Sequence, residues 1–184
     1  MTDFIYVDNS NLFIEGKRVA AVRNGLARDI LQAMNQDIQD NSYSIDFGKL
    51  YQFLTGTDCP TIGRCYLLGS RPPPNDTLWD IAERAGFEVK VVDRNIRNKE
   101  KKIDTGIATE MVADALEYAN KKLDTITLVA GDSDYVPPIE RLINAGFKNV
   151  EVAFWNQCAI ELKQICTKFT ILDSHFDHLA YHRR

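Results

Sequence analysis

Leu128-Val129-Ala130-Gly131-Asp132-Ser133-Asp134-Tyr135 is the stretch that decides the fold class of this chain. The apolar residues that open it predict a buried parallel strand, and the glycine predicts a sharp turn at the end of that strand. Pro137 and Pro138 then mark the first turn of a helix, where a missing amide hydrogen costs least. Ligands bind at the carboxyl ends of strands in an open α/β sheet. Asp132 and Asp134 therefore indicate either a cation site or a turn, because turns favour aspartate for their own reasons.

The composition is that of a soluble globular protein. With 184 residues, 45% hydrophobic and 26% charged, the chain can form one domain with a sizeable core. No apolar run reaches the roughly 18 residues that span a bilayer. The N-terminus, Met1-Thr2-Asp3-Phe4-Ile5, lacks the basic residues of a signal peptide, so we expect a cytoplasmic protein without a membrane partner. The net charge of −4 argues against coating nucleic acid over the whole surface but permits a local basic patch.

Cysteine and histidine give little indication of a metal site. The four cysteines are Cys59, Cys65, Cys158 and Cys166. None forms a C-x-x-C pair, so we expect reduced thiols rather than a zinc site or a disulfide framework. His175, His178 and His182 could share one side of a helix, for which packing on the body is a better explanation than zinc.

Predicted strands and helices alternate along the chain, which indicates a parallel sheet with right-handed crossovers. The predicted strands are 4–7, 64–69, 87–92, 126–130 and 150–155. A polar elbow over 8–11 precedes a short helix, and the further predicted helices are 17–41, 44–55, 75 or 76 to 85, 104–119, 136–145 and 159–168. We expect a single domain over residues 1–174 and a C-terminal tail over 175–184. Whether 17–41 covers a site or forms an interface stays open.

Three acidic clusters stand at predicted strand ends or helix starts: Asp8, Asp104 with Glu110, and Asp132 with Asp134. The ends of the first and fourth strands are neighbours at the switch point of a doubly wound sheet, so we expect these clusters on one face. Carboxylates that close need raised pKa values or a cation. Oxygen ligands without His or Cys select Mg²⁺ or Mn²⁺, and two such ions about 4 Å apart suit phosphoryl transfer. Taken singly, Asp104 could instead cap its helix and Glu110 could be a solvated surface residue.

Three motifs in sequence order carry a resemblance. They are Asp8-Asn9-Ser10-Asn11-Leu12, Lys102-Ile103-Asp104 followed by Glu110, and Gly131-Asp132-Ser133-Asp134-Tyr135. Together they resemble the NYN domain family, a branch of the PIN-like metal-dependent nucleases, from about Phe4 to Leu172. The resemblance implies a three-layer α/β/α sandwich with a mostly parallel doubly wound sheet of strand order 3-2-1-4-5. It also implies a carboxylate cluster that holds Mg²⁺ or Mn²⁺, with RNA as the substrate.

The resemblance assigns roles by position. Asp8, Asp104, Asp132 and Asp134 match the acidic set that holds metal, and Asn11 matches the polar residue after the first strand, which would orient water or a phosphate oxygen. Glu110 stands where members of the family have Asp, so it would be a more distant ligand or a base. The sequence also departs from the family's Lys-Gly before Asp104, where it has Lys101-Lys102-Ile103.

The segment from Arg94 to Lys102 is the most charged part of the chain, with five basic residues against Glu100. It follows the third predicted strand, on the same side of the sheet as the carboxylates, and could hold a phosphate backbone. The candidate contacts are Arg71, Arg94, Arg97, Lys101 and Lys102. A solvated loop is the alternative. Trp155 is a candidate for stacking on bases, whereas Tyr135 is expected to pack beneath the site.

These observations favour a divalent-metal-dependent ribonuclease with Asp8, Asn11, Asp104, Glu110, Asp132 and Asp134 as catalytic residues. Other metal and phosphoryl sites of α/β proteins fit less well. Leu12 lacks the hydroxyl of an adhesion-type metal motif, Ser10 stands where a haloacid-dehalogenase phosphatase needs Asp, and Asn156 stands where a receiver domain needs Lys. The alternative that stays open is a non-catalytic module of the same fold that binds RNA or a protein. The sequence leaves the oligomeric state open, including a homodimer.

Overall fold

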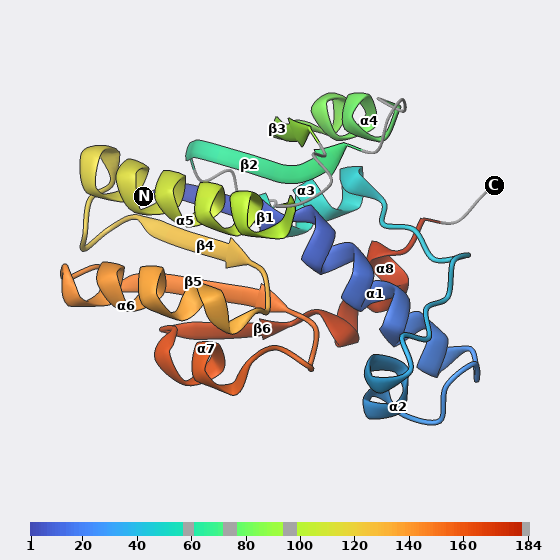
Figure 1. Cartoon of the computed structure of the whole chain (residues 1–184). Coiled ribbons are helices and arrows are strands. Elements are labelled where there is room, and N and C mark those ends of the chain that lie inside the picture. The colour runs from blue at the N-terminus through green and yellow to red at the C-terminus, as the bar shows by residue number, and fades with distance from the viewer. Residues whose placement is uncertain (57–60, 72–76, 94–98, 182–184) are drawn as a thin grey trace.

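The middle layer of the molecule is one sheet of parallel strands (Figure 1). Its strands are β1 (Thr2–Asp8), β2 (Thr61–Arg71), β3 (Glu88–Asp93), β4 (Thr125–Val129), β5 (Asn149–Phe154) and β6 (Lys168–Ile171). Their order is β3-β2-β1-β4-β5-β6, which confirms the predicted order of the first five and adds β6 at one edge. The computed structural model describes residues 1–56, 61–71, 77–93 and 99–181, and for 70, 71, 92, 93 and 99–104 the backbone alone.

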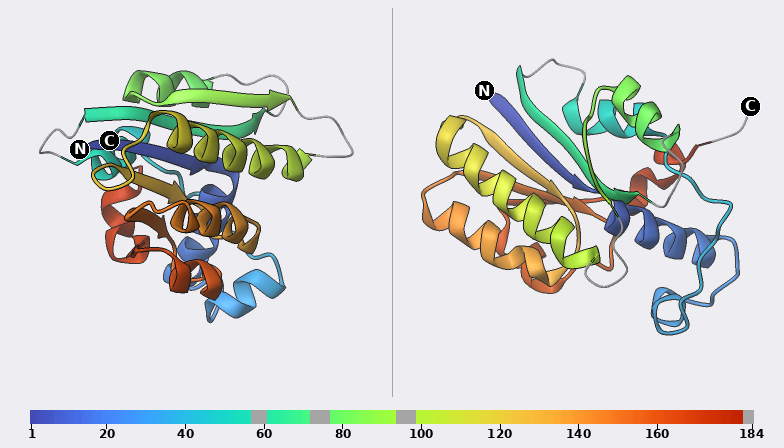
Figure 2. Two further views of the ribbon diagram at one scale, coloured as in Figure 1. Left: turned by 90° about the vertical axis from the view of Figure 1, so that its left-hand side faces the viewer. Right: turned by 45° about the horizontal axis from the view of Figure 1, so that its top comes forward.

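Helices cover both faces of the sheet, so the fold is the predicted three-layer α/β/α sandwich. The α-helices are α1 (Asn9–Arg23), α2 (Ile30–Asn35), α3 (Phe47–Thr55), α4 (Thr77–Ala85), α5 (Lys99–Tyr118), α6 (Val136–Asn144), α7 (Ile160–Ile165) and α8 (Phe176–Leu179). Helices α5, α6 and α7 form one outer layer, and α3, α4 and α8 lie on the other side (Figures 1 and 2). Two short 3₁₀ turns, η1 (Ser133–Tyr135) and η2 (Leu172–His175), connect elements on the carboxyl side. Within the described ranges, no helix combines the length and apolar character needed to cross a bilayer.

The central strand β1 is buried on both faces and passes directly into α1. Phe4 to Val7 are all buried, as expected for a strand between two helical layers. Asp8 caps α1, because its Oδ1 accepts a hydrogen bond of 3.0 Å from the Asn11 backbone amide. The polar elbow predicted over 8–11 is therefore wrong: Asn9, Ser10 and Asn11 form the first turn of the helix.

The single helix predicted over 17–41 is also wrong. Helix α1 ends at Arg23, and Gly25 follows with φ of 73°. Asp29 then caps the short α2 through a bond of 2.8 Å from the Gln32 amide. The apolar spacing in this region reflected two helices joined by a turn, and the glycine and the capping aspartate interrupt the pattern. Both helices lie beyond the carboxyl ends of the strands (Figure 1).

Other helix boundaries differ from expectation at their ends. Helix α5 begins at Lys99 rather than Asp104, so Asp104 lies inside the helix and does not cap it. Helix α6 carries its two prolines in the first turn, as predicted, and α7 ends at Ile165, before the predicted end at 168. The predicted caps at Asn75 or Asp76 lie outside the described residues.

Residues 175–181, expected in a C-terminal tail, pack on the domain. Phe176 and Leu179 are buried, and Ala180 forms an antiparallel bridge with Ile45. The His175 ring lies 4.6 Å from the Phe53 ring, centroid to centroid, so packing accounts for this histidine. His182 lies outside the described residues.

Candidate active site

Two predicted acidic positions meet where β1 and β4 end. The strands are paired in register from Asp3 with Thr125 to Val7 with Val129. Asp8, the last residue of β1, therefore stands beside the Ala130-Gly131 turn that leads from β4 to Asp132. This is the switch point of the sheet, where the crossover connections leave in opposite directions and a site can open between them.

The Asp8 carboxylate is buried and held from two sides. It is 2% exposed, its Oδ1 accepts the Asn11 amide at 3.0 Å, and its Oδ2 accepts the Tyr135 hydroxyl at 2.9 Å. Tyr135 itself is fully buried, as predicted for a residue beneath the site. Each carboxylate oxygen has two lone pairs, so these bonds fix the orientation of Asp8 and leave it capacity for further partners.

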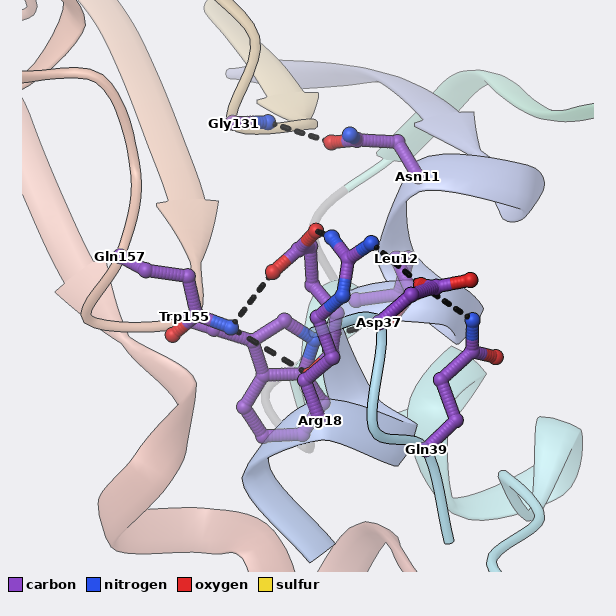
Figure 3. A network of polar contacts seen from close by, with 9 residues as sticks. Asn11, Leu12, Arg18, Asp37, Gln39, Gly131, Trp155 and Gln157 are labelled. Atoms are coloured by element: carbon purple, nitrogen blue, oxygen red, sulfur yellow. Dashed lines mark hydrogen bonds and ion pairs between the residues drawn. The ribbon is translucent and has the colours of Figure 1, made fainter. Parts of the chain in front are cut away.

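The turn before Asp132 is held through both polar groups of Gly131. The Gly131 amide donates to Asn11 Oδ1 at 2.8 Å (Figure 3). The Gly131 carbonyl accepts from the Ala159 amide at 2.8 Å. A Cβ atom at this position would overlap the Phe154 ring. The residue does not adopt a positive φ. Glycine is thus required here for close packing against Phe154 rather than for a positive φ.

Negative charge accumulates around Asp132. Partial burial, then the nearby Asp8, raises the pKa of the Asp132 carboxyl, and Glu15 and Asp134 add to the increase. A hydrogen bond from the Asn11 side chain opposes it. Asp132 is nevertheless solvent-accessible. An accessible carboxylate among other carboxylates is a favourable place for a cation, which would relieve the repulsion.

Glu15 is a residue of this region that the sequence interpretation missed. It lies on α1 one turn after Asn11 and is 8% exposed. Its carboxylate pairs with Arg18 and accepts a hydrogen bond of 2.9 Å from Gln157 Nε2, in the loop between β5 and α7 (Figure 3). The spacing of four residues from Asn11 places both side chains on one helix face, and this was the signal available in the sequence.

Glu110 lies on α5 and pairs with the edge strand β3 of the sheet. Its carboxylate forms an ion pair of 2.9 Å with Lys90 of β3, and β2 separates β3 from β1. The Lys90 ammonium also lies 4.0 Å from the centroid of the Tyr66 ring. The structure therefore pairs Glu110 with Lys90, and its function as a distant ligand or a base stays a prediction.

The hydroxyl of Tyr135 gives a direct test of how Asp8 is held. Tyr135→Phe is expected to destabilise the fold by about 1.5–3 kcal/mol, because a buried carboxylate loses a donor. Any activity at this site should fall about 10- to 100-fold, as when a group that orients a ligand is removed. The free energy of unfolding from urea titrations and the cleavage rate are the measurements.

Tyr43→Phe is the matched control for Tyr135→Phe. Tyr43 is also buried, at 7% exposure, but its hydroxyl finds no hydrogen-bond partner among the described residues. Its removal should leave stability unchanged or improved. Equal losses for the two variants would contradict the assigned function of the Tyr135 hydroxyl.

The comparison with protein families decides the identity of the fold. The model of the NYN domain family matches residues 4–173, almost the whole chain. The chain belongs to the NYN domain family. NYN domains are PIN-like nucleases, so the family supports nuclease activity at a coarse level. No curated protein matches the chain.

A solved structure supports the fold independently. A protein of unknown function, VPA0982 from Vibrio parahaemolyticus, is similar to this NYN domain with a TM-score of 0.68. The similarity covers 98% of this chain and 96% of that protein at 17% sequence identity. At that identity the likeness concerns the fold alone.

The expected base contact of this NYN domain at Trp155 is wrong. Trp155 is fully buried, and its Nε1 donates to the Leu12 carbonyl at 2.9 Å, so its ring is not available to a base. For the other expected RNA contacts, Arg71, Lys101 and Lys102, the backbone alone is described, and Arg94 and Arg97 lie outside the described residues.

The metal site expected from the sequence is not assembled within the part of the chain that the structure describes. No group of three or more His, Cys, Asp or Glu side chains in that part is arranged to hold a metal ion. Asp134 is exposed in η1, and the side chain of Asp104 is not among those described. The structure thus brings the expected ligands Asp8 and Asp132 to one edge, with Asp134 beside Asp132 in the same turn.

Proposed function

We propose that this NYN domain is a divalent-metal-dependent ribonuclease that hydrolyses RNA phosphodiester bonds at the edge formed by Asp8 and Asp132. The observation that carries this proposal is the fixed geometry at the junction of β1 and β4. A buried carboxylate, Asp8, is held by Tyr135 and Asn11, and an accessible carboxylate, Asp132, follows a turn that Asn11 also holds. A solvent-exposed turn does not need its aspartates held by this many buried contacts.

The donor atoms suit a hard cation. Asp8 and Asp132 supply oxygen ligands, and the raised pKa of the Asp132 carboxyl reflects burial and repulsion from Asp8 that a cation would offset. Together with Asp104 and Asp134, these residues would hold Mg²⁺ or Mn²⁺. When bound, the cation supplies activation of water at neutral pH and stabilises charge on the phosphate.

The residues of the chain position the reacting groups. Asp8 and Asp132 would bind and orient the cation at the edge. Tyr135 holds the Asp8 carboxylate from beneath. Asn11 is a positioning residue, because its Oδ1 already accepts the Gly131 amide and its side chain bonds Asp132. The expectation that Asn11 orients water or a phosphate oxygen stays a prediction.

The basic segment would hold the RNA backbone on the same side of the sheet. The double substitution Lys101→Ala/Lys102→Ala is expected to weaken RNA binding and to reduce the slope of log affinity against log salt by about 1.4, or 0.7 for each lost phosphate contact on a single strand. Fluorescence anisotropy with a labelled single-stranded RNA at several salt concentrations measures both quantities.

The control for the basic segment is Lys121→Ala/Lys122→Ala. These exposed lysines precede β4, at the opposite end of the strands. Their substitution removes the same amount of charge. If both double variants change the slope equally, the effect reflects net charge and the basic segment is not an RNA contact.

The experiment that tests the function is a cleavage assay with labelled single-stranded and structured RNA in Mn²⁺, Mg²⁺ or EDTA. We expect cleavage in either metal, no cleavage in EDTA, and products with a 5′-phosphate. Cleavage that persists in EDTA would refute the metal-dependent function. Binding of RNA without cleavage would favour a non-catalytic module, an alternative that gains weight from the engagement of Glu110 with Lys90.

A further inference from the structure

A groove of about 690 Å³ lies on the side of α1 that faces away from the acidic edge. Its lining residues are Phe13, Lys17, Asn41, Ser42, Tyr43, Ser44 and Tyr181. Successive helical residues are rotated by about 100°, so Phe13 and Lys17 lie roughly opposite Asn11 and Glu15. Helix α1 and the C-terminal segment that carries Tyr181 both lie beyond the carboxyl ends of the strands (Figure 1). The elements that carry the groove thus lie beyond the same end of the sheet as the acidic edge.

The wall of the groove carries a positive charge that its contacts do not neutralise. Lys17 Nζ donates to Asn41 Oδ1 at 2.9 Å and lies 4.7 Å from the centroid of the Phe13 ring. Both partners are uncharged. The residues that line the groove include no acid, so an anion would meet an attractive field there.

Asp40 is a carboxylate near enough to Lys17 to interact with it electrostatically, and it is satisfied locally. Asp40 accepts hydrogen bonds from the Ser42 amide at 2.8 Å, the Ser42 hydroxyl at 2.6 Å and Asn24 Nδ2 at 2.6 Å. These hydrogen bonds do more than Lys17 to hold the pKa of the Asp40 carboxyl low. The ammonium of Lys17 therefore stays available to an incoming anion.

An exposed aromatic ring stands at the rim of the groove on a fixed backbone. Tyr181 is 55% exposed, although its amide donates to the Ser44 carbonyl at 2.8 Å and the preceding residue, Ala180, bridges Ile45. An anchored backbone with an open ring resembles a stacking platform more than a core aromatic residue. Stacking on such a ring is tolerant of sequence, because every base has a π face.

We propose that this groove binds one unpaired nucleotide of an RNA strand, with the base stacked on Tyr181 and a phosphate at Lys17. The inference deepens the proposed function, since it takes RNA as the ligand. A volume of 690 Å³ lies within the range of small-molecule sites and accommodates one nucleotide. Lys17 lies about 14 Å along α1 from the cap at Asp8, at 1.5 Å per residue, so the bound nucleotide is distant from the bond that is cut.

The hydroxyl and amide groups around the groove favour this ligand over a protein surface. The Asn41 amide nitrogen and the Ser44 hydroxyl are groups of the kind that a base edge or a ribose uses, whereas the Ser42 hydroxyl already donates to Asp40. A protein partner would call for an apolar centre with aromatic anchors. Beside the rings of Phe13 and Tyr43, the groove instead combines one cation and one open ring with the polar side chains of Asn41, Ser42 and Ser44.

The test measures binding of a short fluorescent single-stranded RNA by anisotropy in EDTA, so that cleavage cannot interfere. We expect Tyr181→Ala to weaken binding about tenfold and Tyr181→Phe, which keeps the ring, to bind as the wild type does. Lys17→Gln should weaken binding and reduce the salt slope by about 0.7. Tyr118→Ala is the matched control, because Tyr118 is 57% exposed at the end of α5, on the opposite edge of the sheet. Thermal unfolding confirms that each variant is folded.

The outcomes separate the groove from the nuclease. If the wild type cleaves RNA while Tyr181→Ala and Lys17→Gln bind RNA normally, the nucleotide site in the groove is refuted and the nuclease function stands. If RNA binds through Tyr181 and Lys17 but is not cleaved, the nuclease function is refuted and the nucleotide site in the groove stands. If Tyr181→Ala instead weakens only self-association in sedimentation, the groove is a protein contact. Absence of RNA binding by the wild type also overturns the proposal.

Discussion

Asp132→Asn is expected to lower RNA cleavage by more than about 100-fold and, at the same time, to raise the melting temperature of the metal-free protein at pH 7. Removal of a group that merely supports a metal ligand costs about 10- to 100-fold, so loss of a ligand should cost more. Stability should increase because asparagine keeps the shape of the side chain and removes a charge that burial and Asp8 disfavour.

The pH dependence of the stability gained by Asp132→Asn follows from the direction of the Asp132 pKa shift. Folding raises the pKa of this carboxyl, so the folded state holds the proton more tightly than the unfolded state does. The wild type therefore loses stability as pH rises from the ordinary aspartate pKa, about 3.9, through the raised value. The extra stability of Asp132→Asn over the wild type should be fully present above this pH range and absent below it.

Thermal unfolding in EDTA at pH 3.5 and pH 7 measures the effect of Asp132→Asn. Glu140→Gln is the control, since it removes one negative charge from an exposed position on α6. A variant that is less stable than the wild type at pH 7, or that still cleaves RNA, would show that Asp132 is a structural turn residue.

Trp155→Ala is expected to destabilise the protein by about 3–5 kcal/mol, the range for removal of a large buried aromatic side chain. Trp155 is fully buried, with ring centroids 6.4 Å from Tyr43 and 6.0 Å from Phe176. Its indole also donates to the Leu12 carbonyl at 2.9 Å, which joins β5 to α1. Urea unfolding followed by circular dichroism gives the free-energy difference.

Trp155→Phe separates the structural function of Trp155 from RNA contact. The smaller ring keeps part of the packing and loses the hydrogen bond, so the loss should be smaller than for alanine. RNA affinity of the folded variant should equal that of the wild type. A selective loss of RNA affinity without loss of stability would restore the expectation that Trp155 stacks on bases.

The sheet could be predicted from the sequence because its strands are continuous apolar runs that end at Gly, Asp or Asn. The order of the first five strands was available through the resemblance to NYN domains. The 17–41 region was harder, since Ile30, Leu31 and Met34 keep a helical spacing although all three lie in the short α2, after the turn that ends α1. In fact Leu31 is 68% exposed and Met34 is 39% exposed, so apolar spacing there did not report burial.

The site was predictable only where a side chain follows a strand. Asp8 and Asp132 could be placed from strand order alone, because parallel strands bring their carboxyl ends to one edge. The contacts of Tyr135 with Asp8, and of Ala159 with Gly131, join residues that strand order cannot bring together. The same limit applies to Trp155, whose position after β5 suggested exposure although α1 covers it.

Binding of Mn²⁺ tests most directly whether the edge between Asp8 and Asp132 is a cation site. Unfolding temperatures at pH 7 with increasing Mn²⁺ should rise for the wild type, because a ligand of the folded state stabilises it by RT ln(1 + [L]/Kd). The rise should be absent in Asp132→Asn and unchanged in Glu140→Gln. A wild type without any rise, or an equal rise in all three proteins, would contradict the assignment of this edge as a metal-dependent nuclease site.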